Sequence, residues 1–106
     1  MNLWADLSCP EAQEQLHILL ERPGVRIERI VSRGYASPPG FWYDQAQHEW
    51  VCVLAGKAVL QLEDRLVTLG AGDSFLLPAH TRHRVHATSS DPACLWLCVF
   101  WEDAPC

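Results

Sequence analysis

The sequence predicts an all-β fold, an antiparallel jelly-roll barrel preceded by one short amino-terminal helix. Two observations predict the barrel: seven or eight short apolar segments follow one another at regular spacing between residues 25 and 101, and no helical period separates them. With 106 residues, the chain has room for one domain with a single core. We therefore expect a helical segment over residues 1–24 and the barrel over residues 25–106.

The amino-terminal helix is predicted over about residues 9–21. Ser8 can cap it, Pro10 suits its first turn, and Glu11 lies three residues after Ser8, as in a capping box. A leucine-rich stripe follows, and Pro23-Gly24 is a typical helix end.

The strands are predicted from an apolar period of two. It begins at Val25, and the segments 57–62, 65–69, 74–77 and 83–88 continue it through turns. The segments 50–54 and 93–101 are apolar on both faces, which indicates strands that are covered on both sides. Because one short helix is the only predicted cover, we expect two barrels to cover each other as a homodimer.

Composition excludes several classes of partner. The formal net charge is −5 and the chain has no run of lysine or arginine, so we expect neither nucleic acid nor an anionic membrane as a partner. No stretch approaches the roughly 18 apolar residues of a membrane span, and the amino terminus lacks the features of a signal peptide. We therefore expect a cytoplasmic location. The five cysteines, Cys106 included, are odd in number and lie mostly inside apolar strands, which favours reduced thiols.

Two residues with metal-binding side chains stand at the beginnings of predicted strands. Glu49 precedes the strand 50–54, and a turn after Pro78 places His83 at the start of the strand 83–88. A carboxylate with an imidazole suits zinc, iron, manganese or nickel. Gln45, four residues before Glu49, can add an amide oxygen. His48 is the better ligand chemically, but it can join only if the strand bulges, since neighbours in a strand point to opposite faces.

At these residues the chain resembles the cupin family. The first cupin motif ends in a glutamate and a glycine with six residues between them, as Glu49 and Gly56 are. The second motif has a glycine, five residues, a proline, and a histidine five positions further on, which Gly72, Pro78 and His83 match. The resemblance covers roughly residues 25–101 and implies a cupin barrel.

The chain departs from the family where the first motif normally supplies two histidines. Those places hold Trp42 and Asp44, or Tyr43 and Gln45. The resemblance implies a metal-dependent enzyme that acts on a small organic molecule. The alternative is a metal-free barrel without catalytic activity, in which Glu49 and His83 are a buried pair and which either binds a small molecule or is structural.

Overall fold

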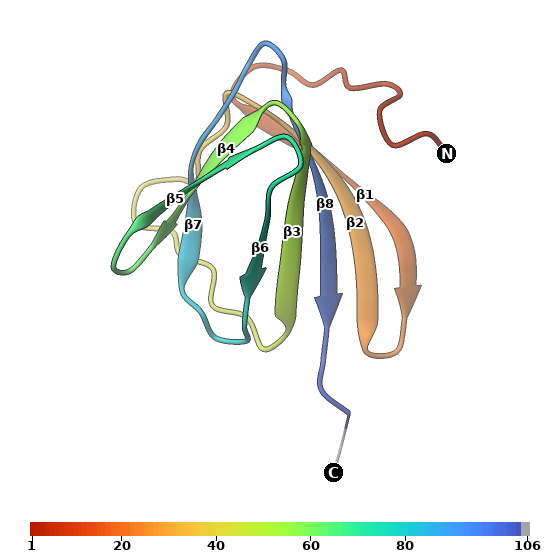
Figure 1. The fold of residues 1–106 in the computed structure, drawn as a ribbon, viewed down its shortest axis with the longest axis vertical. Coiled ribbons are helices and arrows are strands. Elements are labelled where there is room, and N and C mark those ends of the chain that lie inside the picture. The colour runs from red at the N-terminus through yellow and green to blue at the C-terminus, as the bar shows by residue number, and fades with distance from the viewer. Residues whose placement is uncertain (105–106) are drawn as a thin grey trace.

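Residues 1–104 are described in a computed structural model, where they form eight strands and no helix (Figure 1). The strands are β1 (Gln13–Arg22), β2 (Val25–Arg33), β3 (His48–Ala55), β4 (Lys57–Leu62), β5 (Leu66–Gly70), β6 (Ser74–Leu77), β7 (His83–Thr88) and β8 (Cys94–Trp101). One sheet has the order β1-β2-β8-β3-β6 and the other the order β5-β4-β7, with antiparallel pairing throughout. The predicted all-β antiparallel fold is confirmed.

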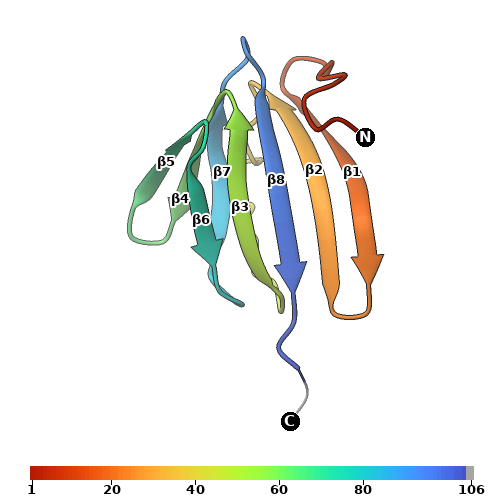
Figure 2. The ribbon, with the colours of Figure 1, turned by 45° about the vertical axis from the view of Figure 1, so that its right-hand side comes forward.

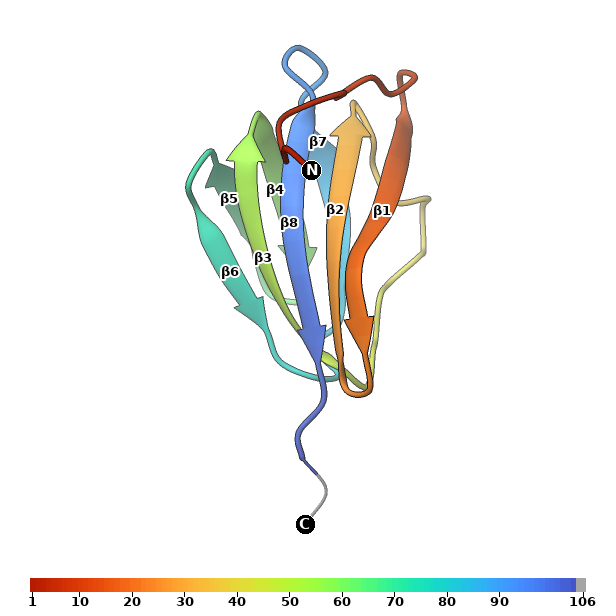
Figure 3. The same ribbon diagram turned by 90° about the vertical axis from the view of Figure 1, so that its right-hand side faces the viewer.

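The two sheets form two layers with the core between them. In Figure 3 the five-stranded sheet faces the viewer, and the strands of the smaller sheet lie behind it. Cross-strand partners such as Val51 and Cys98, or Val53 and Trp96, point together to the inner face of the larger sheet. Leu60 on β4 belongs to the same buried cluster, so the core joins the layers.

The predicted amino-terminal helix is wrong. The residues assigned to it are mostly in β1, an edge strand that pairs with β2 along its whole length (Figure 2). Pro23 and Gly24 make the turn of this hairpin, with Gly24 at a φ of +81°. Glu11 caps no helix; its carboxylate accepts a hydrogen bond from Ser90 Oγ at 2.7 Å. Backbone pairing with β2 thus outweighs the local helical signals.

The segment before β1 covers one end of the outer face of the larger sheet, where it crosses β2 and β8 (Figure 3). Cys9 packs there in a cluster with Val31 and Leu95, and Leu7 lies against the same cluster. Arg29, only 2% exposed, donates hydrogen bonds of 2.7 and 2.9 Å to the carbonyl oxygens of residues 5 and 6. This extended segment takes over part of the covering role that the helix was expected to have.

The four cysteines among residues 1–104 are free thiols in the structure, while Cys106 lies outside the described residues. No helix in the described part of the chain is long and apolar enough to cross a membrane.

Candidate functional site: a pocket between the two sheets

Glu49 and His83 meet inside the barrel, one from each sheet. Glu49 lies on β3 between its partners Leu77 and Phe100, which places its side chain on the inner face; it is 8% exposed. His83 is the first residue of β7 and is 4% exposed. The Oε1 atom of Glu49 lies 3.5 Å from the Nε2 atom of His83. The predicted pairing of these two residues is therefore present in the structure.

The hydrogen bonds of His83 determine which ring nitrogen faces Glu49. Nδ1 lies 2.9 Å from the carbonyl oxygen of Thr81, which can only accept, so Nδ1 carries a proton and Nε2 faces the carboxylate. Tyr43 stacks on the ring at a centroid distance of 5.2 Å and holds its plane. Burial lowers the pKa of His83, but its hydrogen bonds to Glu49 and Thr81 and the Glu49 charge outweigh burial and raise the pKa above the ordinary 6.5.

The loop 34–47 brings Gln45 to the same point. Tyr43 pairs with the backbone of His83 as an isolated bridge, which extends the smaller sheet by one short segment. Two residues later, the Gln45 carbonyl accepts a hydrogen bond from the His80 amide at 2.7 Å, and the Gln45 side-chain amide donates one to Glu49 Oε1 at 3.0 Å. Gln45, Glu49 and His83 are thus brought together.

His48 lies apart from this group. It pairs with Trp101 on the outer face of the sheet, where the two rings are 5.3 Å apart. Its Nε2 atom lies 2.9 Å from a carboxylate oxygen of Asp103, and its Nδ1 atom accepts a hydrogen bond from the Ala79 amide at 3.0 Å. The register of β3 against β8 is regular at His48, so the bulge that would have turned this side chain inward is absent there.

The pocket around Glu49 and His83 has mainly apolar walls. It holds about 510 Å³ of space free of protein atoms, counting its open mouth. Its apolar lining includes Ile30, Val51, Leu60, Leu77, Trp96 and Phe100. A few polar groups that converge in an apolar hollow are typical of a small-molecule site.

Glu14 is a lining residue that the sequence analysis missed. Its Oε2 atom accepts a hydrogen bond from Ser32 Oγ at 2.6 Å, and Trp96 Nε1 donates to the same hydroxyl at 3.1 Å. Burial raises the pKa of Glu14, and the Ser32 hydrogen bond only partly opposes this. Burial also raises the pKa of Tyr43 to about 12, with Glu14 as the next largest cause. Reading residues 13–22 with a period of two would have placed Glu14 on the inner face.

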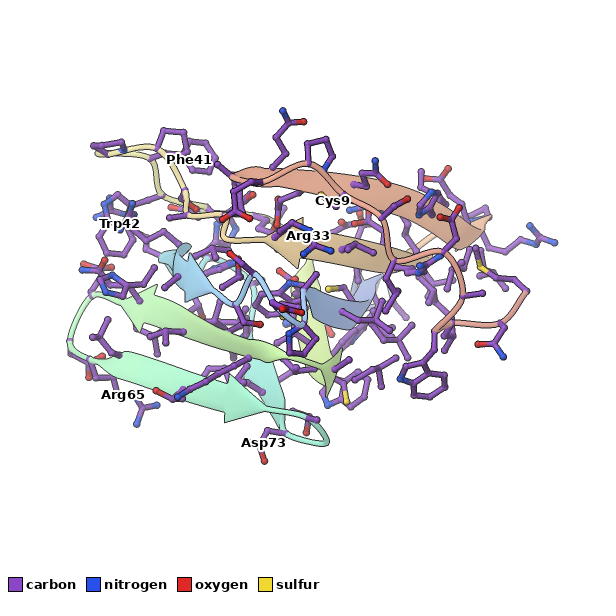
Figure 4. The ribbon with its side chains drawn as sticks, turned by 90° about the horizontal axis from the view of Figure 1, so that it is seen from above. Cys9, Arg33, Phe41, Trp42, Arg65 and Asp73 are labelled. Carbon is purple, nitrogen blue, oxygen red and sulfur yellow. The ribbon has the colours of Figure 1, made fainter. Side chains whose placement is uncertain are left out.

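Trp42 and Phe41, which precede Tyr43, do not line the pocket. Both lie on the loop at the edge of the molecule (Figure 4). Phe41 packs edge to face on Tyr43 with ring centroids 4.8 Å apart, and the Arg82 guanidinium lies 5.0 Å from the Trp42 ring centre. Among residues 1–104, no three or more histidine, cysteine, aspartate or glutamate side chains gather as a metal cluster.

Comparison with known proteins agrees with this fold. The cupin domain family matches residues 32–100. The chain belongs to the cupin family. A comparison with curated proteins found no match.

Solved structures extend the likeness over nearly the whole chain. A protein from Ralstonia eutropha JMP134, provisionally assigned as a mannose-6-phosphate isomerase, is 44% identical over 97% of both chains, with a TM-score of 0.91. A cupin superfamily protein from Desulfitobacterium hafniense DCB-2 is 21% identical over 91% of this chain and 84% of its own, with a TM-score of 0.77. KdgF from a Halomonas species is 24% identical over 98% and 94%, with a TM-score of 0.72. The last two likenesses show the fold alone.

Proposed function

We propose that the pocket binds one divalent metal ion through Glu49 and His83, assisted by Gln45, and acts there on a small organic molecule. The observation that carries this proposal is the approach of His83 Nε2 to Glu49 Oε1 at 3.5 Å. Two ligand atoms that are each about 2.1 Å from one tetrahedral ion lie about 3.4 Å apart. The separation of the two atoms therefore suits a shared ion.

The surroundings of His83 support the same assignment. A histidine that binds a metal usually donates its other ring N–H to a carbonyl or carboxylate, as His83 Nδ1 does to Thr81. Half a turn of the Gln45 amide would present its oxygen to the same point in place of its nitrogen. An ion held there would supply a Lewis acid that polarises a carbonyl or hydroxyl of the bound molecule.

The chain's own residues would position that molecule and restrict water around it. Tyr43 keeps the plane of His83, and the apolar walls lower the local dielectric. The relative from Ralstonia eutropha, with its provisional isomerase assignment, supports a sugar-like molecule as the substrate class.

A second candidate is a metal-free pocket that binds a small molecule without catalysis. The observation that favours it is the small number of strong ligands: among the described residues, only Glu49 and His83 meet, with a neutral amide as the third group. Without a metal, protonated His83 and ionised Glu49 form a buried ion pair in which each charge has the other as its partner.

Calorimetric titration of zinc, manganese and ferrous iron into chelator-treated protein separates the two candidates. We expect the wild type to take up about one ion per chain near neutral pH, because two strong ligands already converge. His83→Ala should abolish uptake. His86→Ala is the matched control, since His86 lies exposed on the same strand, and it should bind as the wild type does.

Two results would overturn the metal proposal. One is a wild type that takes up no ion near neutral pH, and the other is His83→Ala binding as tightly as the wild type. Thermal unfolding of each variant confirms that a lost signal does not come from a lost fold.

A further inference from the structure

We infer that the pocket takes an uncharged polyhydroxyl molecule, such as an unmodified sugar, and discriminates against its phosphate ester, with Glu14 as the residue that sets this preference. The inference rests on the proposed small-molecule function of the pocket and adds the class of its ligand. The charge of the lining opposes a phosphate group, and the polar atoms of the lining suit hydroxyl groups.

The charged lining of the pocket is mainly acidic. Glu14 comes from β1 and Glu49 from β3, so two carboxylates face the same space. Among residues 1–104, His83 is the only basic residue of the lining, and it already lies 3.5 Å from Glu49. A phosphate dianion in this space would meet two carboxylates and one histidine that is itself paired.

In the described part of the chain no lysine or arginine lines the pocket, although the sequence has eight of these residues. Three arginines are held by backbone carbonyls: Arg29 by residues 5 and 6, Arg33 by Cys9 and Ser90, and Arg84 by Ser37. Through these hydrogen bonds the guanidinium groups hold loops and the amino-terminal segment in place. They are not free to turn toward a ligand without breaking those contacts.

The other arginine and lysine side chains contact groups outside the pocket or lie at the edges of the molecule. Arg26 shares the inner face with Glu49, but Phe100 separates the two residues. Its guanidinium is bound to Glu28 at 2.5 Å and lies over the Phe100 ring. The remaining ones lie outside the lining. Arg22 is at the end of β1 and Lys57 at the start of β4. Arg65, labelled in Figure 4, lies near Phe75, and Arg82 lies near Glu63 and Trp42.

A bound divalent ion would not reverse this balance. Its two charges are matched by the two carboxylates of the lining, so little positive charge remains for a dianion. Proteins usually bind phosphate with arginine, lysine or the amides at a helix start, and the described chain contains no helix.

The polar atoms that do face the pocket suit hydroxyl groups. Carboxylate oxygens of Glu14 and Glu49 accept hydrogen bonds, and hydroxyls donate them. Tyr43, Trp96 and Phe100 also line the pocket and offer apolar surface to the C–H groups of a sugar ring. The lining thus matches a neutral polyol better than an anion.

Mannose and mannose-6-phosphate, which differ in one phosphate group, test the inference by calorimetry or ligand-detected NMR on the purified protein. We expect mannose to bind and mannose-6-phosphate to bind at least about tenfold more weakly. The phosphate group is repelled by both carboxylates, whereas the hydroxyl group in the same place on mannose is not. Glu14→Gln should reduce this ratio by about threefold or more. Glu21→Gln, which removes the same charge from the exposed end of β1, should leave the ratio unchanged.

Equal or tighter binding of mannose-6-phosphate by the wild type would overturn the inference, as would binding of neither sugar. If Glu14→Gln leaves the ratio unchanged, Glu14 does not set the preference for the uncharged sugar. The metal titration tests the proposed function separately, so a protein that binds metal but prefers the phosphate ester keeps the metal site and loses only the uncharged ligand class.

Discussion

Gly56 follows β3 in a conformation that only glycine adopts easily. Its φ is +75°, and a Cβ atom added to it would lie 2.5 Å from the carbonyl oxygen of Ala93 and 2.7 Å from Ser89 Oγ. The first of these neighbours is backbone, so it cannot rotate away. The turn between β3 and β4 passes so close to the start of β8 that a side chain does not fit at this position of the cupin motif.

Gly56→Ala should destabilise the protein for two reasons, left-handed strain and the clash with Ala93. Gly24→Ala is the matched control, because Gly24 has a similar φ of +81° but nothing within 4 Å of its added Cβ. We expect Gly24→Ala to cost about 1 kcal/mol of unfolding free energy and Gly56→Ala at least about 2 kcal/mol more. Chemical denaturation measures both, and equal losses would show that the contact with Ala93 is unimportant.

The raised pKa of His83 makes the metal-free protein sensitive to pH. A histidine whose pKa is higher in the folded chain adds stability that is complete below its ordinary pKa of 6.5 and is lost as the pH rises through the folded value. The melting temperature of chelator-treated protein should therefore fall as the pH rises above about 6.5. His83→Gln should flatten this part of the profile, and an unchanged slope in that variant would assign the pH dependence to another group.

At the scale of elements, the period of two predicted the strands of the barrel but missed β1. Leu16, Ile18 and Leu20 alternate as a strand does, while Leu16, Leu19 and Leu20 also fit a helical stripe. The structure resolves this ambiguity by pairing residues 13–22 with β2, with a register shift between Ile18 and Leu20. The hairpin turn at Pro23 and Gly24 is also typical of a helix end, which is why it and the leucine signal pointed to a helix.

The same distinction separates the site residues that were predicted from those that were not. Glu49 and His83 follow from strand beginnings and motif spacing, and Gln45 from its distance of four residues to Glu49. His48 was the less favoured ligand on strand geometry, and its side chain is on the outer face. Glu14 could not be found without β1, because its place in the pocket depends on the strand that the sequence analysis misassigned.

At the scale of the whole molecule, one row of apolar side chains crosses the outer face of the larger sheet. Leu20, Ile27, Val99, Trp50 and Leu76 are cross-strand neighbours in that order, from β1 to β6. Leu20 is 40% and Leu76 51% exposed, and the three residues between them are half-buried. The amino-terminal segment covers the other end of this face, so the row stays open to solvent.

We propose that this row is the contact between two copies of the chain, which would remove a continuous apolar surface from water. Sedimentation at micromolar concentration should then give a mass of about 24 kDa, twice the 12.0 kDa of one chain. Leu76→Lys places a charge in the row on each copy of a twofold contact and should yield monomers. Leu66→Lys is the matched control, because Leu66 is similarly exposed, at 54%, but lies on β5 of the other sheet, and it should remain dimeric. A 12 kDa wild type would reject the dimer, and a dimeric Leu76→Lys would move the contact to another face.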